Sequence, residues 1–147
     1  MLSDAPQPSR AGALYLVPTL LGPAQVAASL PRAVVQIVHE VDGFIAENAK
    51  SARQFLKAVE YPGPLREVPI AELNEHTPAS ALPGLLAPVH AGKRIGLLSE
   101  AGCPAVADPG AELVALAHRQ GLRVVPLVGP SSLLMALAYF GFFLNLI

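Results

Sequence analysis

Five short candidate strands, most of them apolar, recur along the 147-residue chain, and a turn and a stretch of helical periodicity separate each one from the next. They are residues 13–18 (ALYLVP), 44–47 (FIAE), 66–70 (REVPI), 94–98 (RIGLL) and 123–128 (RVVPLV). Strands that alternate with helices are typical of right-handed βαβ units. The pattern therefore predicts an α/β domain with a mostly parallel sheet and flanking helices. Pro69 limits the third run to an edge or an end of the sheet, whereas 94–98 is expected to be a central strand.

Helices are expected over residues 31–41, 51–59, 78–92 and 109–120. The first has a single apolar face, formed by Val34, Ile37, Val38 and Val41. Ser51 is the predicted N-cap of the second, and Pro83 and Pro88 are expected to interrupt the third. In the fourth, Asp108 suits the cap, Pro109 the first helical position, and Gly121 the position just past the end.

Composition sets limits on the class of protein. A length of 147 residues with 52% hydrophobic content suits one packed domain, expected over 13–147 after a flexible arm at 1–12. The net charge is −1 and no basic block is present, so a strong sequence-independent grip on nucleic acid is not expected. A single cysteine and the absence of a signal-peptide pattern favour a reducing, cytoplasmic setting. The apolar stretch 133–147 is shorter than the ~20 residues that span a bilayer, which favours a buried helix over a membrane segment.

In a parallel sheet, ligands bind beyond the carboxyl ends of the strands. Four loops are candidates on that rule: 19–23, 48–50, 99–108 and 129–132. In the third, small residues let a ligand approach the backbone, and Glu100 is either a hydrogen-bond acceptor for a ligand or a solvent-exposed acid. In the fourth, Ser131 or Ser132 is expected to start a helix.

Several other chemistries find no support in the motifs. The sequence contains no HExxH and no paired Cys or His spacing, so no metal site is expected. It also lacks a P-loop, a GxGxxG fingerprint after the first strand and a G-x-S-x-G elbow. Nothing in the spacing links Cys103 to a histidine, so we interpret it as a small buried side chain.

Two segments, SEAGCPAVADPGAELV and VVPLVGPSSLL, strongly resemble the tetrapyrrole methylase superfamily, and LYLVPTLLG, AENAKSARQFL and LNEHTP follow its motif order. The resemblance extends from Ala13 to Leu137. Within the superfamily, the chain is most similar to the branch that includes ribosomal small-subunit RNA 2′-O-methyltransferases. Two departures weaken the RNA assignment: LLGPAQV follows the first strand, and Glu47-Asn48-Ala49-Lys50 stands where those members have Glu-Asp-Thr-Arg.

The resemblance implies an S-adenosylmethionine cleft between two α/β domains, and usually a homodimer. Only the N-terminal domain is expected here, because the second domain is absent from these residues and the end at Ile147 suggests truncation. The cofactor-binding residues that we expect are Pro18, Glu100, Gly102, Cys103, Pro104, Val106, Ala107, Ser131 and Ser132.

The resulting hypothesis is an S-adenosylmethionine-dependent methyltransferase, weakly active as a short chain. Its acceptor is either a ribose hydroxyl of ribosomal RNA or a small molecule. Glu47 and His76 are the candidate proton acceptors, each with the alternative of an ordinary strand-end or loop residue. The competing hypothesis is a degenerate, non-catalytic α/β module retained for binding or dimerisation.

Overall fold

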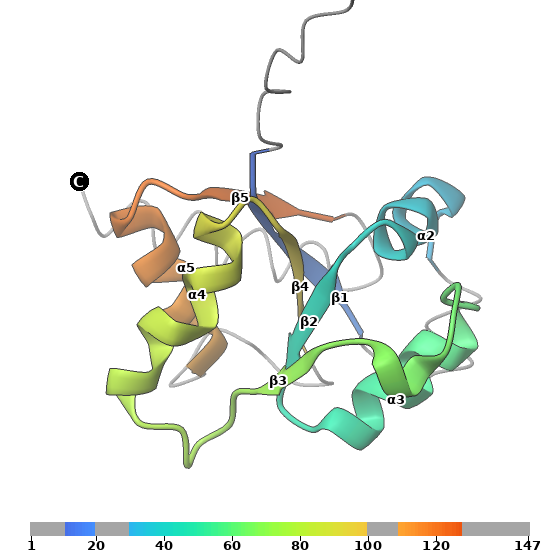
Figure 1. Cartoon of the computed structure of the whole chain (residues 1–147), viewed down its shortest axis with the longest axis horizontal. Coiled ribbons are helices and arrows are strands. Elements are labelled where there is room, and N and C mark those ends of the chain that lie inside the picture. Colours follow the sequence, from blue (N-terminus) through green and yellow to red (C-terminus); the bar gives the residue numbers. More distant parts are fainter. Residues whose placement is uncertain (1–10, 20–29, 100–108, 128–147) are drawn as a thin grey trace, which may run out of the picture.

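The computed structural model describes residues 11–19, 30–99 and 109–127 (Figure 1). Five strands form one sheet in the order β3-β2-β4-β1-β5, and every neighbouring pair is parallel. The strands are β1 (Ala13–Pro18), β2 (Gly43–Ala46), β3 (Ile70–Glu72), β4 (Arg94–Ser99) and β5 (Arg123–Pro126). The predicted α/β class and parallel sheet are confirmed, with β4 central and β3, which follows Pro69, at an edge.

Helices cover both faces of the sheet. They are α2 (Arg32–His39), α3 (Ala49–Ala58), α4 (Leu82–His90) and α5 (Pro109–Arg119), with single 3₁₀ turns η1 (Leu65–Glu67) and η2 (Ala79–Ala81). From β1 to β3 the chain steps across the sheet in one direction, and from β3 to β5 it steps back. Right-handed crossovers therefore place α2 and α3 on one face and α4 and α5 on the other, as Figure 1 shows.

The sheet separates two hydrophobic cores, and β1 contributes alternate side chains to both. Ala13, Tyr15 and Val17 pack with the buried residues of α2 and α3. Leu14 and Leu16 pack with those of α4 and α5. A strand covered by helices on both faces must be apolar at every position, which explains the unbroken run ALYLVP.

Three local predictions were wrong. α3 begins at Ala49 rather than after Ser51, because Asn48 is its N-cap and accepts the Ser51 backbone N–H on Oδ1 at 3.1 Å. The third strand is 70–72 rather than 66–70, since residues 65–67 form η1. The helix expected to be interrupted runs through both prolines: Pro83 occupies its first turn, and Pro88 lies within it.

Smaller shifts affect the second and fifth strands. Gly43 belongs to β2 and Glu47 lies beyond it, one residue earlier than predicted at each end. β5 ends at Pro126, and position 128 lies outside the described residues.

The predicted end of α5 is confirmed. Gly121 has a φ of +70°, and its N–H donates to the His118 carbonyl at 3.0 Å. The Leu122 N–H donates to the Ala117 carbonyl at 2.9 Å, so these two bonds satisfy carbonyls at the end of the helix. Pro109 is the first helical residue, and Asp108 lies outside the described residues.

The amino edge of the sheet is tied by polar contacts around Asp42. Its Oδ2 accepts the Arg94 N–H at 2.8 Å, and its own N–H donates to the Arg94 carbonyl at 2.8 Å. Tyr61 closes the same corner: its hydroxyl donates to the Val41 carbonyl at 2.6 Å, and its ring packs edge-on against Phe44 at 5.7 Å. These contacts fix α2 and the end of α3 against the start of the sheet.

Candidate functional site

The carboxyl ends of β1 and β4 lie side by side at the same level. Pro18 and Ser99 are register partners at the last position of both strands. The next described helix after β1 is α2, on one face of the sheet, and the next after β4 is α5, on the other. Neighbouring strands whose connections diverge in this way define the topological switch point, where ligands bind in open α/β sheets.

Pro18, the predicted residue beneath the cofactor, is fully buried at this edge. The next residue, Thr19, is half-buried, and its hydroxyl Oγ1 is shielded from solvent. Over the described ranges, that hydroxyl has no hydrogen-bond partner. An unsatisfied buried polar group costs about 1–3 kcal/mol, so Thr19 Oγ1 is the sort of group that a polar ligand would satisfy.

Thr19 was included in a candidate loop but was not itself predicted as a site residue. The only signal in the sequence is its position, directly after the first strand. Burial of its hydroxyl depends on tertiary packing, which the local sequence does not report.

Glu47 lies at the same edge, one strand further along. It follows β2, whose last residue, Ala46, is level with Leu98 of β4 and with Glu72 of β3. Glu47 is exposed, and the residue takes part in an interaction with a neighbour. Asn48 follows and caps α3, so the carboxylate is placed between the end of a strand and the start of a helix.

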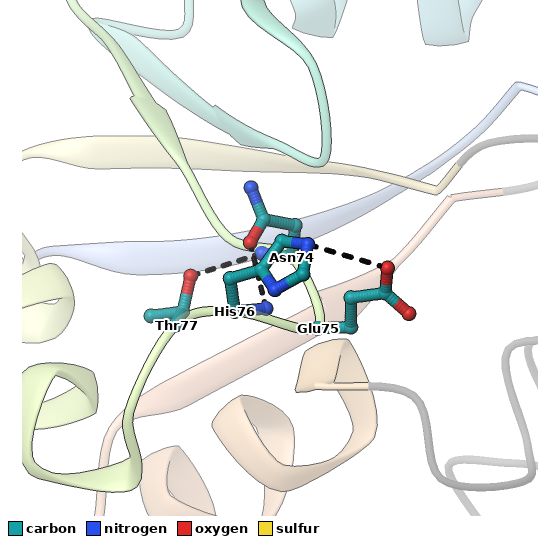
Figure 2. A network of polar contacts seen from close by, with 4 residues as sticks. All are labelled: Asn74, Glu75, His76 and Thr77. Atoms are coloured by element: carbon teal, nitrogen blue, oxygen red, sulfur yellow. Dashed lines mark hydrogen bonds and ion pairs between the residues drawn. The ribbon is translucent and has the colours of Figure 1, made fainter.

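His76 lies in the loop after β3, in a small polar network (Figure 2). The loop is held by its own contacts: Thr77 Oγ1 accepts the Asn74 N–H at 3.0 Å, and Asn74 Oδ1 accepts the His76 N–H at 2.9 Å. The His76 imidazole is 85% exposed, and its Nε2 lies 3.4 Å from Glu75 Oε1. The backbone of His76 is therefore fixed, whereas its ring stands in solvent.

The other predicted cofactor residues lie outside the described residues: Glu100, Gly102, Cys103, Pro104, Val106, Ala107, Ser131 and Ser132. For the described ranges, no group of three or more His, Cys, Asp or Glu side chains is placed to hold a metal ion. Nor is any helix there long and apolar enough to cross a membrane.

A surface hollow of about 280 Å³ lies between the start of α4 and the outer face of α5. Leu82, Ala115 and Leu116 give it an apolar lining, with Glu112 and Arg119 beside them. It lies against α4 and α5, away from the α2 and α3 face.

Comparison with known proteins identifies relatives over most of the chain. A protein from Escherichia coli O157:H7 named Ribosomal RNA small subunit methyltransferase I is 32% identical over 130 residues, which are 88% of this chain and 43% of that protein. Proteins of the same name from Mesorhizobium japonicum and Bacillus subtilis are 35% and 32% identical, over 88% and 86% of this chain and 41% and 40% of their own lengths. No protein-family model matches the chain.

The chain thus spans about two-fifths of the length of the relatives it matches. The sequence motifs indicated a resemblance to the branch of ribosomal small-subunit RNA methyltransferases. The shared name of these relatives confirms that resemblance.

Proposed function

We propose that the chain binds S-adenosylmethionine at the carboxyl edge of its sheet and serves methyl transfer to a ribose hydroxyl of RNA. The main support is the pairing of Pro18 with Ser99 at the switch point, where the connections of β1 and β4 diverge. The relatives' names add the reaction and the class of acceptor. We extend the proposal to a cytoplasmic homodimer, which the family resemblance implies.

The unpartnered hydroxyl of Thr19 fits a cofactor that carries ribose hydroxyls and an amino-acid group. When bound, S-adenosylmethionine supplies a methyl group on a sulfonium, and its displacement releases a neutral thioether. The chain therefore needs no covalent nucleophile, only groups that bind, align and exclude water. We propose that Pro18 provides a rigid apolar surface beneath the cofactor and that Gly102 and its neighbours line one side of the cofactor site.

Transfer to a hydroxyl forms an O–C bond as the S–C bond breaks, and the hydroxyl proton must leave. Glu47 and His76 are the described side chains at this edge that we propose as proton acceptors. Glu47 is the better positioned of the two, because Asn48 fixes the backbone beside it as the cap of α3. His76 projects into solvent and needs the acceptor RNA to orient it.

The test is a thermal-shift titration with S-adenosylhomocysteine, because a ligand that binds only the folded state raises its melting temperature. We expect a shift for the wild type, a smaller shift for Thr19→Val, and a shift close to that of the wild type for Thr19→Ser, which keeps the hydroxyl. Without ligand, Thr19→Val should be at least as stable as the wild type, because it removes a buried unsatisfied group.

A wild-type chain that shows no shift at saturating ligand would support the degenerate, non-catalytic module instead. Equal shifts for wild type and Thr19→Val would remove Thr19 from the site and leave cofactor binding intact. Gly102→Leu tests the loop after β4 separately, and its shift should be lost.

A further inference from the structure

Helix α3 carries a line of three cations on its outer face. Lys50, Arg53 and Lys57 are all exposed, and their spacings of three and four residues place them on one side of the helix. The opposite side is buried against the sheet and consists of Ala52, Phe55 and Leu56. The cationic side therefore faces away from the core, and Figure 1 shows α3 beside the part of the sheet that carries β2 and β3.

No acid interrupts this line. Residues 48–59 contain no Asp or Glu, and the nearest acids in the chain, Glu47 and Glu60, lie before the cap and after the end of the helix. The ion pairs of the described ranges join Arg94 to Glu40 and His76 to Glu75, so they involve none of the three cations. Gln54, also exposed, adds an amide to the same side.

The line begins at the candidate site. β2 ends level with Leu98, one residue before the end of β4, and only Glu47 and the cap Asn48 separate the end of β2 from the start of α3. Lys50 is therefore at the carboxyl edge, and Lys57 lies seven residues further along, or about 10 Å at 1.5 Å per residue. That length corresponds to about three nucleotide steps of 3.4 Å along one strand.

We infer that the Lys50–Arg53–Lys57 face of α3 binds the phosphate backbone of the acceptor RNA and leads its ribose to the carboxyl edge. The inference rests on the proposed function, because the RNA is led toward the carboxyl edge only if the methyl donor binds there. Cations in a line, with amides and hydroxyls among them, are the groups that contact phosphates without reading sequence. The net charge of the whole chain does not oppose this, because the positive charge is local to one helix face.

The experiment measures binding of a short fluorescently labelled single-stranded RNA by anisotropy over a series of salt concentrations. The test variant is Lys50→Gln/Arg53→Gln/Lys57→Gln. The matched control is Lys93→Gln/Arg119→Gln/Arg123→Gln, which removes three exposed cations from around the amino ends of β4 and β5. All six positions are exposed, so both variants should keep the wild-type melting temperature.

We expect the test variant to lower the slope of log affinity against log salt by about 2, since each phosphate contact to a single strand contributes about 0.7. Its affinity at low salt should fall at least tenfold, and the control should change it less than twofold. Equal losses in the two variants, or no RNA binding by the wild type, would overturn the inference. A competition experiment gives a further test. If polyglutamate displaces the labelled RNA as well as unlabelled RNA does at the same concentration of negative charge, the inference is also overturned, because that result would point to an acidic protein as the partner.

The shift with S-adenosylhomocysteine, measured on the same three proteins, keeps the two proposals separate. A normal shift without RNA binding rejects the α3 surface and leaves the cofactor site. RNA binding that depends on α3, without a shift, rejects the cofactor site and leaves the surface.

Discussion

Gly96 of β4 lies against the ring of Phe44, its register partner on β2. A Cβ built at Gly96 would lie 2.9 Å from Phe44 Cδ1, closer than real contacts allow. The ring is itself held, because Tyr61 packs against it at 5.7 Å and the Phe44 side chain is buried. A glycine in the central strand is therefore required by the packing of its neighbour.

Gly96→Ala should destabilise the fold by about 1–3 kcal/mol, the usual cost of overpacking a core. Urea unfolding measures it. The control is Gly84→Ala at an exposed position of α4, where the added methyl group meets open space and should raise the free energy of unfolding by about 0.5–1 kcal/mol. If Gly96→Ala is no more destabilising than Gly84→Ala, the Phe44 ring can move aside and the prediction is wrong.

Asn48→Ala should cost about 0.5–2 kcal/mol, because it removes the side chain that caps α3. Ser51 contributes its backbone N–H to that cap, so Ser51→Ala should change the unfolding free energy by less than half as much. The two variants, compared by urea unfolding, decide between the cap predicted from the sequence and the cap in the structure. A larger loss at Ser51 would reinstate the former.

Tyr61→Phe should lower stability by about 0.5–1.5 kcal/mol at neutral pH, through loss of the hydrogen bond to Val41. Burial, and next the charge of Asp42, raise the pKa of Tyr61 above the usual 10.0. The unfolded state therefore loses this proton first, and wild-type stability should fall as pH rises above about 10. Tyr61→Phe should fall less steeply there, which melting curves between neutral and alkaline pH will show.

Burial lowers the pKa of His118 on α5 below the usual 6.5. On acidification the unfolded state therefore takes up a proton first. Part of the stability that is present above pH 6.5 should be lost as the pH falls below 6.5. His118→Gln should flatten this dependence. Melting curves at a series of pH values from neutral to acidic will measure it, and an unchanged pH dependence in His118→Gln would contradict the prediction.

The sequence is most informative where one element is apolar on every side or on one clear face. β1 was predicted residue for residue, because a strand between two helical layers has no polar position. The limits of α5 were predicted nearly as well, because Pro109 suits the first position of a helix and Gly121 the position just past its end.

Elements that depend on distant neighbours were predicted less well. β3 is three residues long and exists through its pairing with Phe44 to Ala46, which no local pattern reveals. α4 continues through Pro88 because Leu82, Leu86 and Val89 pack into the core, and that packing outweighs the loss of a backbone donor. For the candidate site, the strand order places Glu47 and His76 at the carboxyl edge and their roles stay predictions, whereas the exposure of the imidazole and the buried hydroxyl of Thr19 depend on packing.

The position of β1 has a consequence for synthesis of the chain. β1 comes first in sequence among the described strands, yet both its partners, β4 and β5, come much later. The helices α2, α3 and α4, which pack against its two faces, are made earlier, but until β4 follows, β1 has no neighbouring strand with which to pair. During synthesis on the ribosome, β1 must therefore stay unpaired. The pairing of Pro18 with Ser99 at the carboxyl edge can form only after residue 99 has left the exit tunnel.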